Sequence, residues 1–410
     1  MARAATTDTV AIVLAGGQGA RLYPLTRDRA KPAVPFGGRY RIIDFVLSNF
    51  VNSGIFKISV LTQYKSGSLM QHLARAWQLA PQMGHYVAPV PAAMNVGPQW
   101  FRGSADAVFQ NLDVIANEQP AYVCVFGSDH IYQMDVCQML EFHRERGADA
   151  TVAVIPVPAE EMQLYGIVDC DDERRVTGFR EKPPAEPGAQ RTRLASMGLY
   201  VFTAAVVVRA VTEDAARTDS THDFGHDILP CLVERARVFA YDFSTNTIPN
   251  MTEEQRGYWR DVGTIDSYWR TSVDLISVKP ILNLYNTAWP ILSASYPNPP
   301  AKFVFRDEEH NRVGAATNSM VSEGSVISGG QVDRSILGSR VRVNSFSSVS
   351  ESIIFDGVEI GRHARIRRAI IDKNVIVPPG TEIGYDEDED RRRFTVSESG
   401  VVVVPKGMVL

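Results

Sequence analysis

Several residue patterns that define common protein classes are missing from this chain of 410 residues. Its four cysteines form no Cys-x-x-Cys pair, which argues against a structural zinc site and against a disulfide scaffold. No apolar run approaches the roughly 20 residues that a membrane helix needs. The net charge is −5, and no basic block is long enough to bind nucleic acid. We therefore expect a soluble cytoplasmic protein that binds neither nucleic acid nor a membrane.

The N-terminal part, residues 1–280, alternates short apolar runs with amphipathic stretches. Strands are predicted where β-branched and aromatic residues cluster, at 10–14, 58–61, 122–126, 151–154 and 199–202, and helices at 66–78 and 134–146. This alternation is typical of an α/β domain with a mixed, mainly parallel, Rossmann-like sheet. Ligands of such sheets bind at the carboxyl ends of the strands, so the residues that follow each run are the first candidates for a site.

A different pattern follows a connector, residues 281–315, that is rich in proline and asparagine. Nine-residue segments with the pattern small-apolar-apolar-x-x-x-Val-x-apolar recur every 17 residues, at 335–343, 352–360 and 369–377. Because 17 is close to three six-residue faces, the period favours a triangular parallel β-helix. An array of antiparallel hairpins is the alternative, since Val-x-Val spacing is common there too. We predict a left-handed parallel β-helix over residues 316–410, serving assembly and regulation.

A glycine-rich turn, Leu14-Ala-Gly-Gly-Gln-Gly-Ala-Arg-Leu22, directly follows the first predicted strand. It lacks the third glycine of a dinucleotide fingerprint and the Gly-Lys-Ser/Thr of a P-loop. Its backbone N–H groups can still approach a triphosphate, with Arg21 and the later Lys31 as cations. Taken alone, such a loop is more often a plain turn, and it is the two cations that favour phosphate binding.

Two carboxylates follow apolar or aromatic residues at predicted strand ends. Asp129 lies in Phe126-Gly-Ser-Asp-His-Ile-Tyr132, and Asp261 lies in Trp259-Arg-Asp-Val-Gly-Thr264. Carboxylates from separate strand ends suit one Mg²⁺ that bridges phosphate oxygens. As an alternative, Asp129 caps the helix predicted over 134–146. The histidines show no spacing typical of a metal site.

The segment Gly178-Phe-Arg-Glu-Lys-Pro183 places Glu181 and Lys182 side by side at a strand end. A carboxylate that accepts hydrogen bonds from hydroxyls, next to an ammonium that neutralises phosphate, suits a phosphorylated sugar. An exposed surface ion pair is the simpler interpretation of these two residues on their own. The segment Ala195-Ser-Met-Gly198 precedes another strand and is a further candidate for contacts with the sugar.

Together these motifs resemble those of the glucose-1-phosphate adenylyltransferase (ADP-glucose pyrophosphorylase) family of bacterial glycogen synthesis. The motifs that favour this branch of the sugar nucleotidyltransferases are Arg29-Ala-Lys-Pro-Ala33, Arg41-Ile-Ile-Asp-Phe45 and Tyr258-Trp-Arg-Asp-Val-Gly-Thr264. The resemblance covers nearly the whole chain. It implies an Mg²⁺-dependent enzyme that makes ADP-glucose and pyrophosphate from ATP and glucose 1-phosphate, as an allosterically regulated homotetramer.

The resemblance also implies roles for individual residues. The catalytic residues would be Arg21, Lys31, Asp129 and Asp261, of which the two aspartates would hold Mg²⁺. The nucleotide would be bound by Leu14, Gly16, Gly17, Gln63 and Trp100. Glucose 1-phosphate would be bound by Phe101, Gly166, Glu181, Lys182 and Ser196. A Ser–His–Asp or Cys–His set is not needed, because the attacking phosphate of the sugar is already ionised at neutral pH.

The chain departs from the family at three points. Phe101 stands where a tyrosine is frequent, Gly127-Ser128 stands where Ala-Gly is frequent, and Asp28 stands where some bacterial members have an activator-binding lysine. The third departure puts the identity of the activator in doubt. Rival hypotheses are an inactive regulatory subunit of the same fold, an enzyme for another nucleotide or sugar such as a mannose-1-phosphate guanylyltransferase, and an acyltransferase carried by the β-helix.

Arginines are candidates for an effector site. Arg29 and Arg41 lie near the glycine-rich turn in sequence, and Arg365, Arg367 and Arg368 lie between two β-helix repeats. If the two domains pack together, these guanidinium groups could converge on a phosphorylated sugar, for which bidentate arginine is well suited. Surface arginines scattered over two domains are the alternative.

Overall fold

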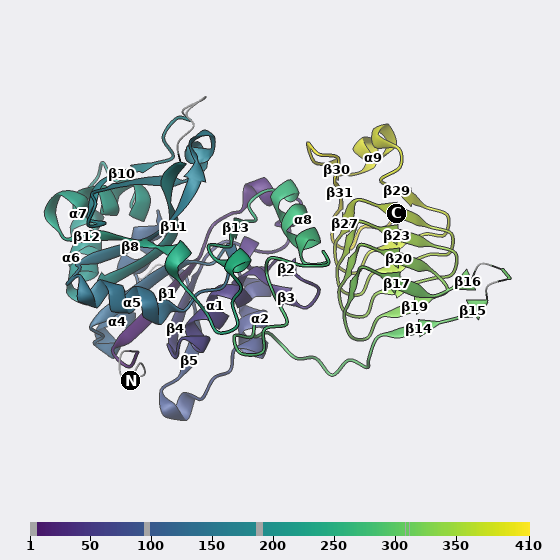
Figure 1. Ribbon diagram of the computed structural model, residues 1–410, viewed down its shortest axis with the longest axis horizontal. Coiled ribbons are helices and arrows are strands. Elements are labelled where there is room, and N and C mark those ends of the chain that lie inside the picture. Colours follow the sequence, from purple (N-terminus) through teal and green to yellow (C-terminus); the bar gives the residue numbers. More distant parts are fainter. Residues whose placement is uncertain (1–5, 94–98, 186–191, 308, 311) are drawn as a thin grey trace.

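The computed structural model describes residues 6–93, 99–185, 192–307, 309–310 and 312–410. A nine-stranded sheet with flanking helices occupies the N-terminal part, and stacked short strands follow from Lys302 onward. Figure 1 shows these two units side by side, joined by the extended connector. Among the described residues, no helix combines the length and the apolar composition that crossing a membrane requires.

The N-terminal sheet is mixed, as predicted. Its strands run in the order β10-β9-β11-β6-β1-β4-β5, with β8 pairing to β11 and β12 to β8. The parallel pairings join β1 to β4 and β6, β4 to β5, and β8 to β12, whereas β11 runs antiparallel to its partners. The strands are β1 (Thr9–Ala15), β4 (Lys57–Thr62), β5 (Tyr86–Pro91), β6 (Tyr122–Gly127), β8 (Ala150–Pro158), β9 (Gly166–Cys170), β10 (Val176–Glu181), β11 (Thr192–Thr203) and β12 (Val238–Asp242).

Helices cover both faces of this sheet. Alternate residues of β1 point to opposite faces, so that Ala11 and Val13 belong to one buried cluster and Ile12 to the other. The first cluster contains side chains of α1 (Ile42–Asn52), α2 (Gly67–Ala76) and α5 (Val136–Glu145). The second contains side chains of α3 (Ser104–Phe109), α4 (Leu112–Glu118), α6 (Ala204–Ala215) and α7 (Leu229–Arg235). The helices predicted over 66–78 and 134–146 are thereby confirmed as α2 and α5.

The C-terminal unit is a parallel β-helix. Its coils form three sheets, in which the strands pair in parallel with their counterparts in the next coil, and among the described residues the antiparallel pairs of this unit are the terminal β30–β31 pair and a separate pair of β15 (Arg306–Asp307) with β16 (Arg312–Val313). Ile336 pairs with Ile353 and Ile353 with Ile370, which reproduces the period of 17 in the sequence. Parallel pairing excludes the alternative of antiparallel hairpins, and the predicted left-handed β-helix is confirmed.

The coils contain the following strands: β14 (Lys302–Val304), β17 (Ala315–Thr317), β18 (Met320–Val321), β19 (Val326–Ser328), β20 (Gln331–Asp333), β21 (Ile336–Leu337), β22 (Arg342–Val343), β23 (Ser348–Ser350), β24 (Ile353–Ile354), β25 (Glu359–Ile360), β26 (Arg365–Arg367), β27 (Ala369–Ile371), β28 (Ile376–Val377), β29 (Glu382–Ile383), β30 (Thr395–Val396) and β31 (Val402–Val404). β14 lies inside the range 281–315 that we assigned to the connector, yet it pairs with β19. A further helix, α9 (Glu387–Arg393), follows β29.

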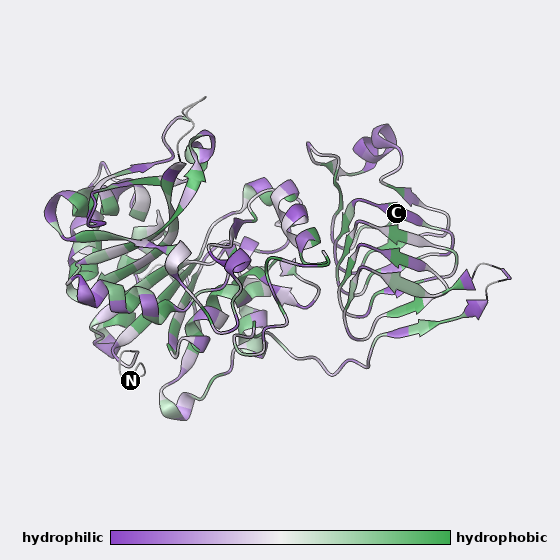
Figure 2. Ribbon diagram, in the orientation of Figure 1, coloured by the Kyte–Doolittle hydropathy of each residue, from purple (hydrophilic) through white to green (hydrophobic). Residues whose placement is uncertain are grey.

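The two units share a hydrophobic core. One buried cluster combines Phe36 and Tyr268 of the N-terminal unit with Ile336, Ile353 and Ile370 of the β-helix. At the same boundary, the indole N–H of Trp269 on α8 (Ile265–Asp274) donates to the backbone oxygen of Glu351. Figure 2 shows hydrophobic residues along the central strands of both units. The β-helix is therefore packed against the sheet domain rather than tethered to it.

Candidate active site

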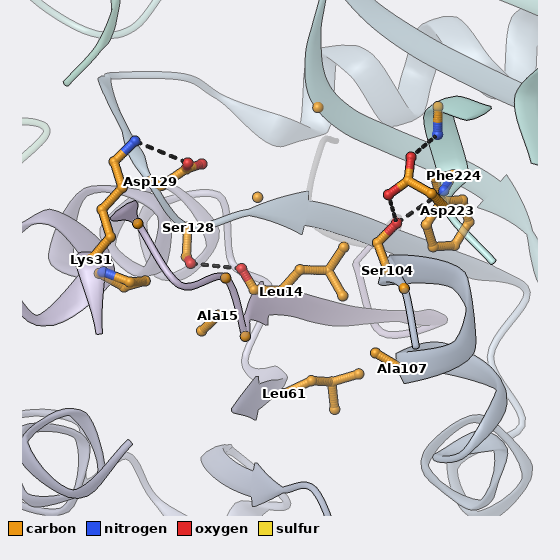
Figure 3. A pocket seen from close by; sticks show the side chains of 18 of the residues that line it. Leu14, Ala15, Lys31, Leu61, Ser104, Ala107, Ser128, Asp129, Asp223 and Phe224 are labelled. Atoms are coloured by element: carbon orange, nitrogen blue, oxygen red, sulfur yellow. Dashed lines mark hydrogen bonds and ion pairs between the residues drawn. The ribbon is translucent and has the colours of Figure 1, made fainter. Parts of the chain in front are cut away.

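A cavity of about 730 Å³ opens at the carboxyl edge of the N-terminal sheet. The loops that follow β1, β4 and β6 meet there because these strands are parallel and adjacent. The Ser128 hydroxyl donates to the carbonyl oxygen of Leu14 at 2.6 Å and ties two of these loops together (Figure 3). Ten of the residues predicted from the sequence line the cavity: Leu14, Gly16, Gly17, Arg21, Lys31, Gln63, Phe101, Asp129, Glu181 and Lys182.

The glycine-rich turn leaves space that side chains would fill. A Cβ atom on Gly17 would meet no atom within 4 Å, so its backbone faces open space. Gly19 adopts φ +62°, and a Cβ atom there would lie 2.9 Å from Cβ of Lys31. The turn therefore exposes backbone at Gly17 and makes room for the lysine at Gly19. Arg21 follows on a short 3₁₀ turn and has 60% of its side chain exposed.

Lys31 joins the two predicted metal ligands. Its Nζ lies 3.0 Å from Oδ2 of Asp129 and 3.1 Å from Oδ1 of Asp261, and the lysine side chain is only 7% exposed. Arg21 approaches the other oxygen of Asp261 at 3.6 Å. Asp129 does not cap α5, because the side chain of Asp135 accepts from the backbone N–H of Cys137 there. The capping alternative for Asp129 is thus wrong.

The charges of this cluster stabilise each other. Burial by itself lowers the pKa of Lys31, but the carboxylates of Asp129 and Asp261 outweigh it and hold that pKa above its ordinary value. Burial likewise opposes ionisation of Asp129, whereas the neighbouring His130 ring and the Lys31 ammonium hold the pKa of Asp129 well below its ordinary value. Asp129 is therefore a carboxylate at neutral pH and Lys31 is an ammonium ion.

The same carboxylates fit a divalent cation. β7 (His130–Tyr132) pairs with β13 (Trp259–Asp261) so that His130 lies opposite Asp261. One ligand atom from each of Asp129, His130 and Asp261 lies within 4.8 Å of the others. His130 Nδ1 is buried and has no hydrogen-bond partner in the described structure. This nitrogen lies 3.4 Å from Oδ1 of Asp129, and the donor set of two carboxylates and one ring nitrogen suits a divalent metal. His130 was missed because its position next to Asp261 depends on strand pairing.

Glu181 lies between two glycines at the other end of the cavity. A Cβ atom on Gly166 would lie 2.7 Å from Oε2 of Glu181, and one on Gly225 would lie 2.5 Å from the same oxygen. Glycine at both positions therefore allows the carboxylate to pass close to the backbone. Lys182 approaches Oε1 of Glu181 at 3.4 Å and keeps 60% of its side chain exposed. The Glu181 carboxylate can accept hydrogen bonds from hydroxyl groups, and the Lys182 ammonium group can neutralise a phosphate.

The remaining residues predicted for substrate binding lie around this cavity. The Gln63 side chain accepts from the Phe101 backbone N–H at 2.7 Å and donates to its carbonyl oxygen at 3.3 Å. Trp100, the preceding residue, is 55% exposed and does not line the cavity. Ser196 is buried and its hydroxyl lies 3.4 Å from the hydroxyl of Tyr200, which does line the cavity.

Sequence reasoning missed one wall of the cavity. Asp223 accepts from the Ser104 hydroxyl at 2.7 Å and from the Gly225 backbone N–H at 2.8 Å. Figure 3 shows this group facing the Lys31–Asp129 pair across the end of β1. The tripeptide Asp223-Phe224-Gly225 has the polar and flexible residues of a site loop. Its partner Ser104 lies 119 residues away in the sequence, and no local pattern connects the two.

The five candidate regulatory arginines have different surroundings. Arg29 is buried and forms a bidentate ion pair with Asp372 of the β-helix. Arg41 donates to the hydroxyl of Ser68 at 2.9 Å and to nearby backbone oxygens. Arg365 pairs with Glu382, Arg368 lies 4.7 Å over the Trp269 ring, and Arg367 is exposed. Binding of an effector by this set stays a prediction.

Comparisons with known proteins agree with this geometry. Residues 10–277 match the family described as nucleotidyl transferase, and residues 299–404 match the one described as GlmU-like, C-terminal hexapeptide. Proteins named glucose-1-phosphate adenylyltransferase from Anaeromyxobacter sp. (strain Fw109-5), Corynebacterium jeikeium and Photobacterium profundum are 55%, 50% and 47% identical to the chain. The matches cover 97–98% of this chain and 97–99% of those proteins. The resemblance drawn from the motifs is thereby confirmed.

Proposed function

Because the chain belongs to the glucose-1-phosphate adenylyltransferase family, we propose that it makes ADP-glucose and pyrophosphate from ATP and α-D-glucose 1-phosphate. The observation that carries the proposal is the division of one cavity into two charged ends. The glycine-rich turn, Lys31 and Asp129 lie at one end, where Lys31 also contacts Asp261, and Glu181 with Lys182 lies at the other. The first end suits a triphosphate with its metal, and the second suits a phosphorylated sugar.

In the proposed reaction, a phosphate oxygen of glucose 1-phosphate attacks the α-phosphorus of ATP in line. A new P–O bond forms, the bond from the α-phosphorus to the bridging oxygen breaks, and pyrophosphate leaves. Neither a protein nucleophile nor a strong general base is required, because the attacking oxygen is already anionic. The protein therefore contributes positioning and charge neutralisation.

Each charged residue of the cavity has a part in this scheme. Arg21, which is largely exposed, neutralises the departing pyrophosphate, and Lys31 binds phosphate while holding Asp129 and Asp261 in register. Asp129 and Asp261 would hold Mg²⁺, which would supply further positive charge against the phosphates when bound. Lys182 orients the attacking phosphate, and Glu181 accepts hydrogen bonds from sugar hydroxyls.

The family resemblance supplies the rest of the proposed binding surface. Leu14, Gly16, Gly17, Gln63 and Trp100 bind the nucleotide, and of these Trp100 does not line the cavity. Phe101, Gly166 and Ser196 complete the sugar end. Gly166 contributes by its lack of a side chain, because it admits Glu181. The ring of Phe101 can pack against a ligand, although it lacks the hydroxyl of the tyrosine frequent in the family.

We place this activity in the cytoplasm, in the synthesis of glycogen or a related α-glucan. The assembly we propose is a homotetramer whose activity responds to phosphorylated sugars or similar small molecules. Arg41, Arg365, Arg367 and Arg368 are candidates to bind such effectors, and so is Arg29 if its ion pair with Asp372 opens. Asp28 adds negative charge near Arg27, with which it pairs, so we expect sugar monophosphates to activate better than a bisphosphate.

Product analysis tests the proposal directly. The protein is incubated with ATP, glucose 1-phosphate and Mg²⁺, and the nucleotide products are separated by chromatography. We expect ADP-glucose and pyrophosphate in equal amounts, and their loss when EDTA removes the metal. Failure to form any nucleotide sugar would favour the rival hypothesis of an inactive regulatory subunit. Product formation without added divalent metal would contradict the assignment of Mg²⁺.

A further inference from the structure

A buried ion pair connects the β-helix to the segment that contains Lys31. The guanidinium of Arg29 donates from Nη1 to Oδ2 of Asp372 at 2.9 Å and from Nη2 to Oδ1 at 2.8 Å. The two side chains are 3% and 2% exposed. The two guanidinium nitrogens donate to both carboxylate oxygens at once, so the contact fixes the relative orientation of the two side chains as well as pairing their charges. The partners are 343 residues apart in sequence.

Removal of one partner would force the other to move. A buried ion pair adds little net stability, because both charges must leave water, but a buried charge without its partner is strongly unfavourable. Besides Asp372, the Arg29 guanidinium donates to the Leu25 backbone oxygen at 3.1 Å, and a neutral acceptor cannot balance its charge. Without Asp372, the guanidinium would therefore turn towards water and draw its backbone with it.

The backbone between Arg29 and Lys31 transmits such a movement. Only Ala30 separates the two residues, and its N–H donates to the Lys65 backbone oxygen at 3.3 Å. Lys31 then starts a 3₁₀ turn with Pro32, whose ring restricts the backbone of its neighbours. A shift at Arg29 therefore reaches Lys31 through a short and stiff connection.

Lys31 has little freedom to compensate. Its ammonium group lies between Asp129, in the connection from β6 to β7, and Asp261, at the end of β13, and its stem is packed against Gly19. A displacement of about 1 Å can cost a reaction of this kind about 100-fold in rate, because the charged groups must match the phosphates. The position of Lys31 is thus sensitive to the contact that Arg29 makes with the β-helix.

We propose that Asp372 is a positioning residue for the nucleotidyl transfer, which acts through Arg29 on Lys31. The β-helix thereby contributes to the active site without touching the substrates. This inference rests on the proposed function of Lys31 in phosphate binding. It gives Arg29 a role in the enzyme without effector.

A double-mutant cycle tests the proposal with the full-length protein. Initial rates of pyrophosphate release are measured for wild type, Asp372→Asn, Lys31→Ala and the double variant, without effector and at raised enzyme concentration for the slow variants. In the presence of Lys31, Asp372→Asn should lower the rate by about tenfold or more. In the Lys31→Ala background, the same substitution should change the rate by less than about twofold, because its target is gone.

The outcomes separate the alternatives. Equal loss in both backgrounds, or no loss in either, would overturn the positioning role. Full activity of Lys31→Ala would instead contradict the proposed function of Lys31, and the positioning role would fall with it. Asp333→Asn is the control, because this carboxylate accepts from Thr317 and Asn318 within the β-helix rather than from neighbours of Asp372, and it should leave the rate within about twofold.

Circular dichroism checks that each variant folds. If Asp372→Asn does not fold, Arg29→Lys takes its place in the cycle, since lysine keeps the charge but loses the bidentate fork. The loss of rate caused by Arg29→Lys is compared in the presence of Lys31 and in the Lys31→Ala background. A loss that disappears in the Lys31→Ala background supports the proposal, and an equal loss in both backgrounds overturns it.

Discussion

In the β-helix, oppositely charged side chains pair along the stack of coils, whereas in the cavity of the sheet domain charges converge from unrelated positions. Three of the β-helix pairs join residues 17 positions apart: Arg334 with Glu351, Asp356 with Lys373 and Arg365 with Glu382. In the cavity, Lys31 meets Asp129 and Asp261, which lie 98 and 230 residues away.

This difference separates the two uses of charge in the molecule. A pair that repeats with the coil places a cation against a carboxylate and so balances the charge of each. At the cavity, by contrast, two carboxylates contact one lysine and lie close to the His130 ring, with Arg21 largely exposed beside Asp261 and Lys182 largely exposed at the sugar end. Charges that are not fully paired by the protein are available to substrates and to a metal. The groups available for chemistry therefore lie in the sheet domain, and the charged pairs of the β-helix hold its coils together.

Removal of the β-helix should have the largest effect of the changes considered, because the sheet domain would lose the partner against which it packs. Deletion of residues 316–410 uncovers Phe36 and Tyr268, which share a buried cluster with the coils. We expect the truncated chain to expose apolar surface, to bind a hydrophobic dye and to lose the proposed homotetramer. Light scattering and activity measurements check this expectation. A soluble, tetrameric and active truncation would show that the β-helix is dispensable.

Substitution of one carboxylate of the cavity should nearly abolish activity while leaving the fold intact. Asp129→Ala removes a metal ligand and a partner of Lys31, so we expect kcat to fall by about 1000-fold or more. Asp333→Ala is the control, since this carboxylate belongs to the β-helix and contacts Thr317 and Asn318 there. Steady-state kinetics with circular dichroism make the measurement. Similar turnover of both variants would contradict the role of Asp129.

A methyl group added at the sugar end of the cavity should weaken the binding of glucose 1-phosphate and leave the binding of ATP nearly unchanged. Gly166→Ala places a Cβ atom 2.6 Å from the Phe179 ring and 2.7 Å from Glu181, so the carboxylate must move. We expect KM for glucose 1-phosphate to rise by about 100-fold, with a much smaller change for ATP. Gly178→Ala, whose Cβ would approach Asp169 at 3.3 Å, is the matched control. An unchanged KM in Gly166→Ala would remove Glu181 from the sugar site.

Loss of the exposed lysine at the same end should have the smallest effect of the four. Lys182→Ala removes one cation from the sugar phosphate, and we expect KM for glucose 1-phosphate to rise by about tenfold while that for ATP changes little. Arg180→Ala, on β10 just before Lys182, removes a cation that pairs with Asp169 and serves as the control. Equal increases in both KM values would identify Lys182 as a structural residue.

Much of the fold could be predicted because it depends on local patterns. The runs at 10–14 and 122–126 became β1 and β6, and the period of 17 gave the stacking of the coils. Asp129 could be predicted because it follows a fully apolar strand. The contacts of Asp223 with Ser104 and of Arg29 with Asp372 could not, because they depend on packing between distant segments. The sequence predicts an effector-binding role for Arg29, whereas the structure shows it buried in an ion pair with Asp372.

Specificity for ATP and glucose 1-phosphate is tested by comparing substrates in the wild-type protein rather than by comparing variants. Initial rates of pyrophosphate release are determined with Mg²⁺ for each of the four nucleoside triphosphates, in combination with glucose 1-phosphate or mannose 1-phosphate. We expect kcat/KM for ATP with glucose 1-phosphate to exceed that of every other combination by about 100-fold or more, because the site is built around one pair of substrates. A preference for GTP with mannose 1-phosphate, or no release with any combination, would contradict this expectation.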